Sequence, residues 1–213
     1  VDAARILLDK GADLKRRTKG GRDALGAAAQ MGRAGCVTLL VDKGAKIDAR
    51  DGKGATPLYM AAQDGHDEVV SKLIDLGADV DLRDDEGTSP LWIASAAGHD
   101  LAVEALIEAK ADVNCGDNFG STPLFAAAQE GRTACARLLL QNGAEAGLSV
   151  WAAARQGHFE VARLLIAHGA DVDKPSSDGS TPVKAARAAG YDDVADLLIG
   201  AGARDGKLPF VTA

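Results

Sequence analysis

The sequence has few aromatic residues, few cysteines and no excess of positive charge. Aromatic residues make up 4% of the 213 residues, so a core must be built from Ala, Leu, Val and Ile within a hydrophobic content of 46%. The net charge of -7 argues against general binding to nucleic-acid phosphates, which requires clustered Lys and Arg. No apolar run approaches the roughly 18 residues that a transmembrane helix needs, so we expect no membrane insertion.

The three cysteines, Cys36, Cys115 and Cys135, are odd in number and widely spaced. This pattern argues against a disulfide framework and against a zinc site, and it favours reduced thiols in an intracellular setting, the cytoplasm or the nucleus. The chain begins at Val1 with no signal-peptide pattern, and we expect a fragment or a trimmed chain. We expect no metal and no cofactor.

Glycine, in contrast, is abundant, with 25 residues in the chain, and many of these glycines are regularly spaced. Two series of glycines advance by 33 residues at each step: Gly21, Gly54, Gly87 and Gly120, and Gly32, Gly65, Gly98 and Gly131. A fixed period of this length indicates a protein built from stacked repeats.

The clearest copy of the repeat runs from residue 51 to residue 83 as DGKGATPLYMAAQDGHDEVVSKLIDLGADVDLR. Thr56 can cap a first helix, and Pro57 suits its first turn because the missing N–H is not needed there. Gly65 can end that helix in the left-handed conformation. Val69, Val70, Leu73 and Ile74 then form the apolar stripe of a second helix. The residues after it predict an extended finger, a short β-hairpin.

The segments TPLYMAAQDGH, SPLWIASAAGH, TPLFAAAQEGR and GADVDL resemble the ankyrin repeat, and the resemblance covers nearly the whole chain. It implies an all-α solenoid of helix-turn-helix repeats with short β-hairpin fingers, in a single domain over residues 1–213. The expected copies are a partial repeat at 1–17, repeats at 18–50, 51–83, 84–116, 117–145, 146–174 and 175–205, and a tail or degenerate repeat start at 206–213.

Two places depart from the repeat. Asp23 and Ala24 replace the Thr-Pro pair in the first full copy, so its first helix should start less firmly. The step from Gly131 to Gly157 is 26 residues instead of 33, and the finger is the missing part. We expect a tight loop there, with a gap in the sequence as the alternative.

The resemblance implies a protein-interaction module or scaffold that binds a partner protein through its concave groove and finger tips. The alternative is a targeting or regulatory domain of a larger enzyme whose catalytic part is not in this chain. Nothing resembles a Ser-His-Asp set, a P-loop or a paired-carboxylate cleft, so we expect no catalysis, and we expect a monomer. By resemblance the contact positions are Lys53, Ala55, Gln63, Asp64, Asp85, Glu86, Thr88, Ala96, Asn118, Phe119, Ser121, Gln129, Glu130, Arg155 and Gln156.

Four first helices carry a large aromatic residue at the same position, where many ankyrin repeats have His: Tyr59, Trp92, Phe125 and Trp151. These residues are open to two interpretations, packing between adjacent repeats or an aromatic binding stripe, since Trp and Tyr are frequent in binding hot spots. Phe119, at an expected finger tip, has no core to join.

Charge and histidine also follow the repeat. The first finger is basic, with Lys15, Arg16, Arg17, Lys19 and Arg22, whereas the third is acidic, with Asp84, Asp85 and Glu86. This arrangement would orient a charged partner, although ordinary solvated charge explains it too. His66, His99 and His158 recur after a helix-ending glycine and are expected to belong to the turn.

Overall fold

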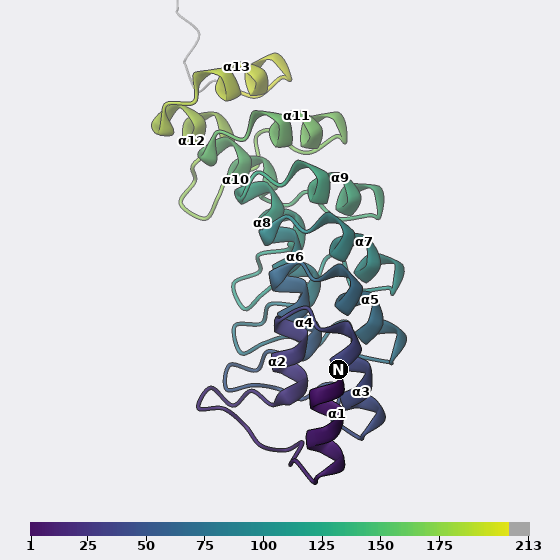
Figure 1. Ribbon diagram of the computed structural model, residues 1–213. Coiled ribbons are helices and arrows are strands. Elements are labelled where there is room, and N and C mark those ends of the chain that lie inside the picture. Colours follow the sequence, from purple (N-terminus) through teal and green to yellow (C-terminus); the bar gives the residue numbers. More distant parts are fainter. Residues whose placement is uncertain (205–213) are drawn as a thin grey trace, which may run out of the picture. The chain divides into compact units, whose positions relative to one another are not determined.

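The computed structural model of the chain describes residues 1–204 (Figure 1). The proposed repeat start at 206–213 lies outside the described residues. Contacts divide the chain into two compact units, residues 1–123 and 124–213. Every regular element within residues 1–204 is an α-helix, so the predicted all-α repeat fold is confirmed. None of the described helices is both long and apolar enough to cross a bilayer.

The first unit holds a single helix, α1 (Asp2–Asp9), followed by three helix pairs: α2 (Ala24–Gln30) and α3 (Ala34–Asp42), α4 (Pro57–Asp64) and α5 (Asp67–Asp75), α6 (Pro90–Ala97) and α7 (Asp100–Glu108). The first helices of the pairs pack on one another in one row, α2 on α4 and α4 on α6. The second helices form a second row, α3 on α5 and α5 on α7 (Figure 1).

The second unit follows the same plan with α8 (Pro123–Gln129), which begins at the boundary, α9 (Thr133–Gln141), α10 (Ser149–Gln156), α11 (Phe159–Ala167), α12 (Pro182–Ala189) and α13 (Asp192–Gly200). Here α10 packs on α11 and α12, α12 packs on α13, and α11 packs on both α9 and α13. The two-row arrangement therefore recurs in each unit.

The first helices begin and end where the repeat predicts. The Thr56 hydroxyl accepts a hydrogen bond from the Tyr59 N–H at 3.2 Å, and Pro57 occupies the first turn. In the first full repeat the Asp23 carboxylate accepts from the Gly26 N–H at 2.9 Å. The expected weak start of that helix is therefore wrong, because a carboxylate caps a helix as well as a hydroxyl does.

Leucine and alanine build the core. One leucine of each helix in the α2–α7 region is fully or almost fully buried, and the first helices add small alanines that are also buried: Leu25, Leu40, Leu58, Leu73, Leu91, Leu106, Ala29, Ala61, Ala62 and Ala94. In the second unit Leu139, Leu165 and Leu198 take the same place on the second helices. Small side chains let neighbouring helices approach closely, which is why so few aromatic residues suffice to close the core.

The fingers, defined as the segments that join a second helix to the next first helix, are reverse turns without strands in the part of the chain that the structure describes. In the finger at residue 51 the Asp51 carboxylate accepts from the N–H groups of Lys53 and Ala55, at 2.9 and 3.1 Å. Asp84 and Asp117 hold the next two fingers of the first unit in the same way. The expected β-hairpins are thus turns held by a side chain.

Neighbouring fingers are joined by arginine side chains that reach forward by 33 residues. The Arg50 guanidinium donates to the Arg83 carbonyl at 2.6 Å, and Arg83 donates to the Gly116 carbonyl at 3.0 Å. Arg17 begins the series by donating to the Arg50 carbonyl at 2.5 Å. Backbone hydrogen bonds also join neighbouring fingers, such as the bond from the Asp85 N–H to the Lys53 carbonyl at 2.9 Å.

The segment between α9 and α10, residues 142–148, is a tight loop in place of a finger. The Ser149 N–H donates to the Ala146 carbonyl at 2.8 Å, and Gly147 has a positive φ of 49°. Residues 142–148 thus join α9 to α10 directly, and a natural loss of the finger stays a prediction. Leu148 precedes α10 without a side-chain cap, because the Thr-Pro pair is absent.

Three histidines each link a repeat to the one before it within the same unit. The imidazole Nε2 of His99 lies 3.1 Å from the Gln63 carbonyl, and His66 and His158 make the same contact with Gln30 and Gln129. The His99 ring lies directly against Gly65, which has a φ of +70°. A Cβ at Gly65 would stand 2.4 Å from Nδ1 of that ring.

We expect Gly65→Ala to destabilise the chain more than Gly77→Ala. Both glycines have a positive φ, but nothing lies within 4 Å of a Cβ at Gly77. Strain alone should cost Gly77→Ala about 1–2 kcal/mol of unfolding free energy. Displacement of the His99 ring should cost Gly65→Ala a further ~1–3 kcal/mol. Urea unfolding followed by circular dichroism measures both, and equal losses would show that the ring contact contributes nothing.

Candidate interaction surface

The finger tips of the first unit present exposed polar side chains that the framework uses only in part. Lys53, Asp85, Glu86 and Asn118 are all exposed. The Asn118 amide donates to the Asp85 backbone carbonyl at 3.1 Å, and the Asp85 carboxylate lies 3.8 Å from the Arg50 guanidinium. The tips therefore offer a varied polar surface on turns whose backbone is held in place.

Phe119 is the most exposed large apolar side chain of the described chain, with 92% of its surface accessible. Its backbone is nevertheless fixed, because the Phe119 N–H donates to the Asp117 carboxylate at 2.8 Å. The prediction that this aromatic residue joins no core is confirmed.

Beside the fingers, Gln63 and Asp64 are exposed at the end of α4. Two other positional candidates are wrong as contact residues, since Ala55 is 8% and Thr88 is 5% exposed. Both residues take part in the finger turns. The Ala55 N–H donates to the Asp51 carboxylate, and the Thr88 N–H donates to the Asp84 carboxylate. Ala96 and Ser121 are half-buried.

Tyr59 and Trp92 are the two members of the aromatic series that lie in the first unit. Their contacts favour packing between adjacent repeats over an exposed binding stripe. Tyr59 is 9% exposed and packs with Ala55, Met60 and Ile93, and its hydroxyl lies 3.2 Å from the Thr88 hydroxyl. The Trp92 indole N–H donates to the Ser121 carbonyl at 2.9 Å. Each ring thus contacts a residue of the following finger, Thr88 for Tyr59 and Ser121 for Trp92, 29 positions later in the chain.

The environment of Tyr59 raises the pKa of its phenol from 10.0 to about 12. Burial is the largest cause, because it disfavours the phenolate, and the nearby charges of Asp84 and Glu86 act in the same direction. The hydrogen bond with Thr88 opposes the shift.

In the second unit the exposed candidates are Gln129, Glu130, Arg155 and Gln156. Phe125 and Trp151 are half-buried. Both line a cavity of about 490 Å³ that sequence reasoning did not predict. The sequence does pair Trp151 with the finger at Ser180, because Ser180 follows Trp151 by the same 29 residues that separate Trp92 from Ser121.

The Trp151 indole differs from that of Trp92 in having no hydrogen-bond partner. Its Nε1 atom is buried, yet it finds no acceptor in the structure as described. The Arg155 guanidinium lies over the indole ring, 5.3 Å from its centre. An aromatic ring with a cation stacked on it therefore forms one wall of the cavity.

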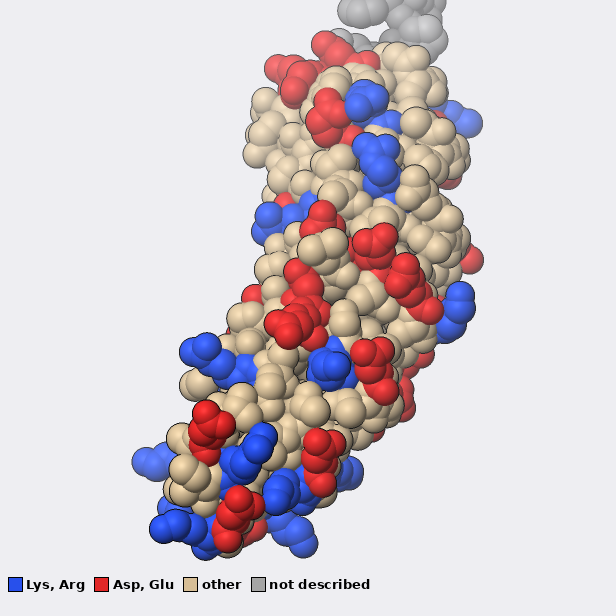
Figure 2. Space-filling view, turned by 45° about the vertical axis from the view of Figure 1, so that its right-hand side comes forward, with Lys and Arg blue, Asp and Glu red and all other residues tan. Residues whose placement is uncertain are grey.

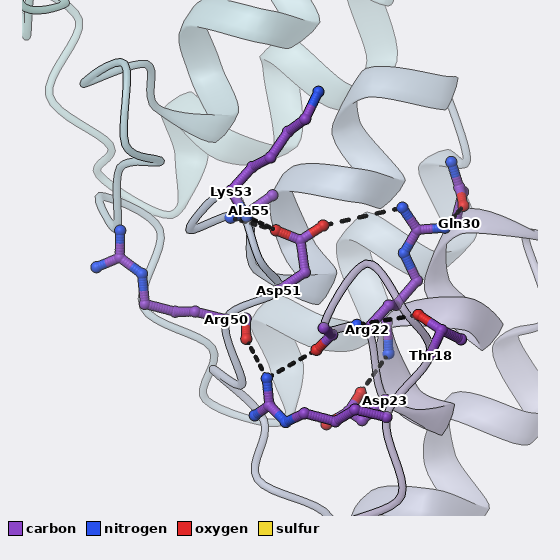
Figure 3. Close-up of polar contacts among 11 residues, drawn as sticks. Thr18, Arg22, Asp23, Gln30, Arg50, Asp51, Lys53 and Ala55 are labelled. Atoms are coloured by element: carbon purple, nitrogen blue, oxygen red, sulfur yellow. Dashed lines mark hydrogen bonds and ion pairs between the residues drawn. The ribbon is translucent and has the colours of Figure 1, made fainter.

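The basic first finger is used in part by the framework. The Arg22 guanidinium lies between the Gln30 side chain, to which it donates a hydrogen bond, and the Asp51 carboxylate at 3.8 Å (Figure 3). Arg17 is bonded to the Gly21 and Arg50 carbonyls. Lys15, Arg16 and Lys19 remain exposed. Figure 2 shows Lys and Arg gathered at the N-terminal end of the first unit, with acidic side chains among them and beyond them.

No cluster of three or more His, Cys, Asp or Glu within residues 1–204 is placed to hold a metal ion. None of the three cysteines forms a disulfide in the part of the chain that the structure describes; Cys135 is buried, and Cys36 and Cys115 are half-buried.

Comparison with known proteins agrees with this architecture. A family model described as ankyrin repeats (3 copies) matches residues 1–84, 58–150 and 148–207. The crystal structure of the human ASB11 ankyrin repeat domain is similar, with a TM-score of 0.81 and 26% sequence identity over 91% of this chain and 90% of that one. No curated protein matches the chain by sequence.

Replacing each tryptophan by phenylalanine should separate the two indoles. Trp92→Phe leaves the Ser121 carbonyl without its donor, whereas Trp151→Phe removes an N–H that has no acceptor. We expect Trp92→Phe to lower the free energy of unfolding by about 1 kcal/mol more than Trp151→Phe. Urea unfolding followed by circular dichroism compares the two variants, and an equal loss would contradict the difference in bonding.

Tyr59 should make the chain sensitive to alkali. A phenol whose pKa is raised by folding stabilises the folded state fully below pH 10, and this contribution is lost as the pH rises through about 12. We expect the wild type to lose more unfolding free energy than Tyr59→Phe between these values, by up to about 3 kcal/mol. Urea unfolding at a series of alkaline pH values tests this, and parallel profiles would refute it.

Proposed function

This chain belongs to the ankyrin-repeat family, and from that premise we propose that it works by binding a partner protein through its finger tips and the exposed ends of its first helices. Ankyrin repeats are generally protein–protein interaction modules. The surface proposed here includes Lys53, Gln63, Asp64, Asp85, Glu86, Asn118 and Phe119 in the first unit, and Phe125, Gln129, Glu130, Trp151 and Arg155 in the second.

The observation that carries the proposal is the exposed Phe119 ring on a fixed turn. A buried aromatic anchor contributes strongly to binding when it enters a partner's pocket. Because the Asp117 carboxylate already holds the backbone of this turn, little chain entropy is lost when the ring is bound. The neighbouring polar tips would form the rim that surrounds such an anchor.

We further propose that the chain itself does not catalyse a reaction. The titratable residues that recur along the chain have structural partners. His66 and His99 bond to the backbone carbonyls of Gln30 and Gln63, and aspartates hold the finger turns. Its three cysteines, none of them in a disulfide within the described residues, fit the reducing interior of a cell, where we place it.

The test is affinity capture of partners from a cell extract, followed by measurement of the dissociation constant of each recovered protein with the wild type and two variants. Phe119→Asp should weaken binding about tenfold or more. Leu101→Asp is the matched control, since Leu101 is 57% exposed but lies on a second helix, α7. Equal affinities for the wild type and both variants would overturn the proposed surface.

A further inference from the structure

The cavity of the second unit lies where the repeat pattern is broken. In the first unit Tyr59 and Trp92 each bond to a residue 29 positions later, Thr88 and Ser121. Ser180 stands at that position relative to Trp151, but its finger makes no such bond, and the cavity opens between Trp151, α12 and this finger. Its volume of about 490 Å³ is in the range of ligand-binding pockets.

Only two charged side chains, Arg155 and Asp178, line the cavity, and they differ in the hydrogen bonds they make. Asp178 accepts hydrogen bonds from the Ser176 hydroxyl and the Ser180 N–H. Arg155 forms no ion pair within 4 Å in the described chain, and its guanidinium lies over the face of the Trp151 ring. The hydrogen bonds of Ser176 and Ser180 lower the pKa of the Asp178 carboxyl, and the charge of Arg155 adds to this at longer range. The cavity therefore holds a cation with free hydrogen-bond donors.

We infer that this cavity binds an acidic side chain, Asp or Glu, from an extended segment of the partner, with the Arg155 guanidinium as its counter-ion. The inference rests on the proposed function. A guanidinium pairs well with a carboxylate because its planar donors match the two oxygens. The methylene groups of the acidic side chain lie against the alanines of α12, Ala185 and Ala188, which also line the cavity.

The stacked indole prepares Arg155 for this role. A guanidinium held over Trp151 has already lost part of its side-chain freedom, so less entropy is lost when it binds a carboxylate. Asp178, which also lines the cavity, opposes an anionic ligand. Because Asp178 is exposed to solvent and already hydrogen-bonded, its repulsion is screened and is weaker than the contact with Arg155.

The probes are three short synthetic peptides that share an Ala- and Ser-rich frame and differ only in a central Glu, Gln or Lys. Their dissociation constants with the full chain are measured by calorimetry. The Glu peptide should bind about tenfold more tightly than the Gln peptide. Arg155→Gln, which keeps the stem of the side chain, should abolish this preference, and Asp178→Asn should enlarge it.

Arg163→Gln is the matched control, because Arg163 is an exposed arginine of the same unit already paired with Glu160 at 2.6 Å. It should leave all three affinities unchanged. Equal or undetectable binding of the three peptides overturns the inference, as does a preference for Lys that Asp178→Asn removes. If Phe119→Asp still abolishes binding of the captured partner in that case, the proposed function stands and only this inference fails.

Discussion

Each described repeat is tied to its neighbour by groups that project across the repeat boundary, and the structure of each unit depends on these contacts. The histidine ring that follows a helix-ending glycine bonds to a carbonyl of the preceding repeat, as His99 does with Gln63. The His99 ring lies against Gly65, the glycine that ends the first helix of the preceding repeat. Only a glycine leaves room for the ring at residue 65 and adopts the positive φ found there without strain. The same residue thus ends one helix and admits the link to the next repeat. A repeat cannot bury its own apolar face, so this coupling is what makes the array stable.

The framework uses a small set of side chains, and this separates stability from recognition. Aspartates hold the finger turns, and Arg17, Arg50 and Arg83 tie the fingers together. The Phe119 side chain takes no part in these contacts, so it can be almost fully exposed on a turn that is well bonded. Partner choice can vary at such positions with little effect on folding.

Much of the fold could be predicted from the sequence, because capping residues, helix-ending glycines and apolar spacing act locally. Asp23 shows where the prediction failed: the sequence suggested a weaker helix start, but an aspartate side chain at the cap position serves as well as threonine. The candidate surface was harder to predict. Ala55 and Thr88 occupy finger positions that were expected to contact a partner, yet both are buried. The Thr88 hydroxyl meets the Tyr59 hydroxyl of the preceding repeat.

The sequence by itself determined the repeat, its 33-residue step, its one shortened finger and the exposed aromatic tip at Phe119, because each of these follows from the spacing of glycines and caps along the chain. Only the tertiary structure decided which aromatic residues are packed and which border open space. Tyr59, Trp92 and Trp151 occupy the same position in their repeats, and each has a hydroxyl residue 29 positions later. Two of those pairs bond and the third does not, because bonding depends on where a finger lies in space and not on which residues it contains.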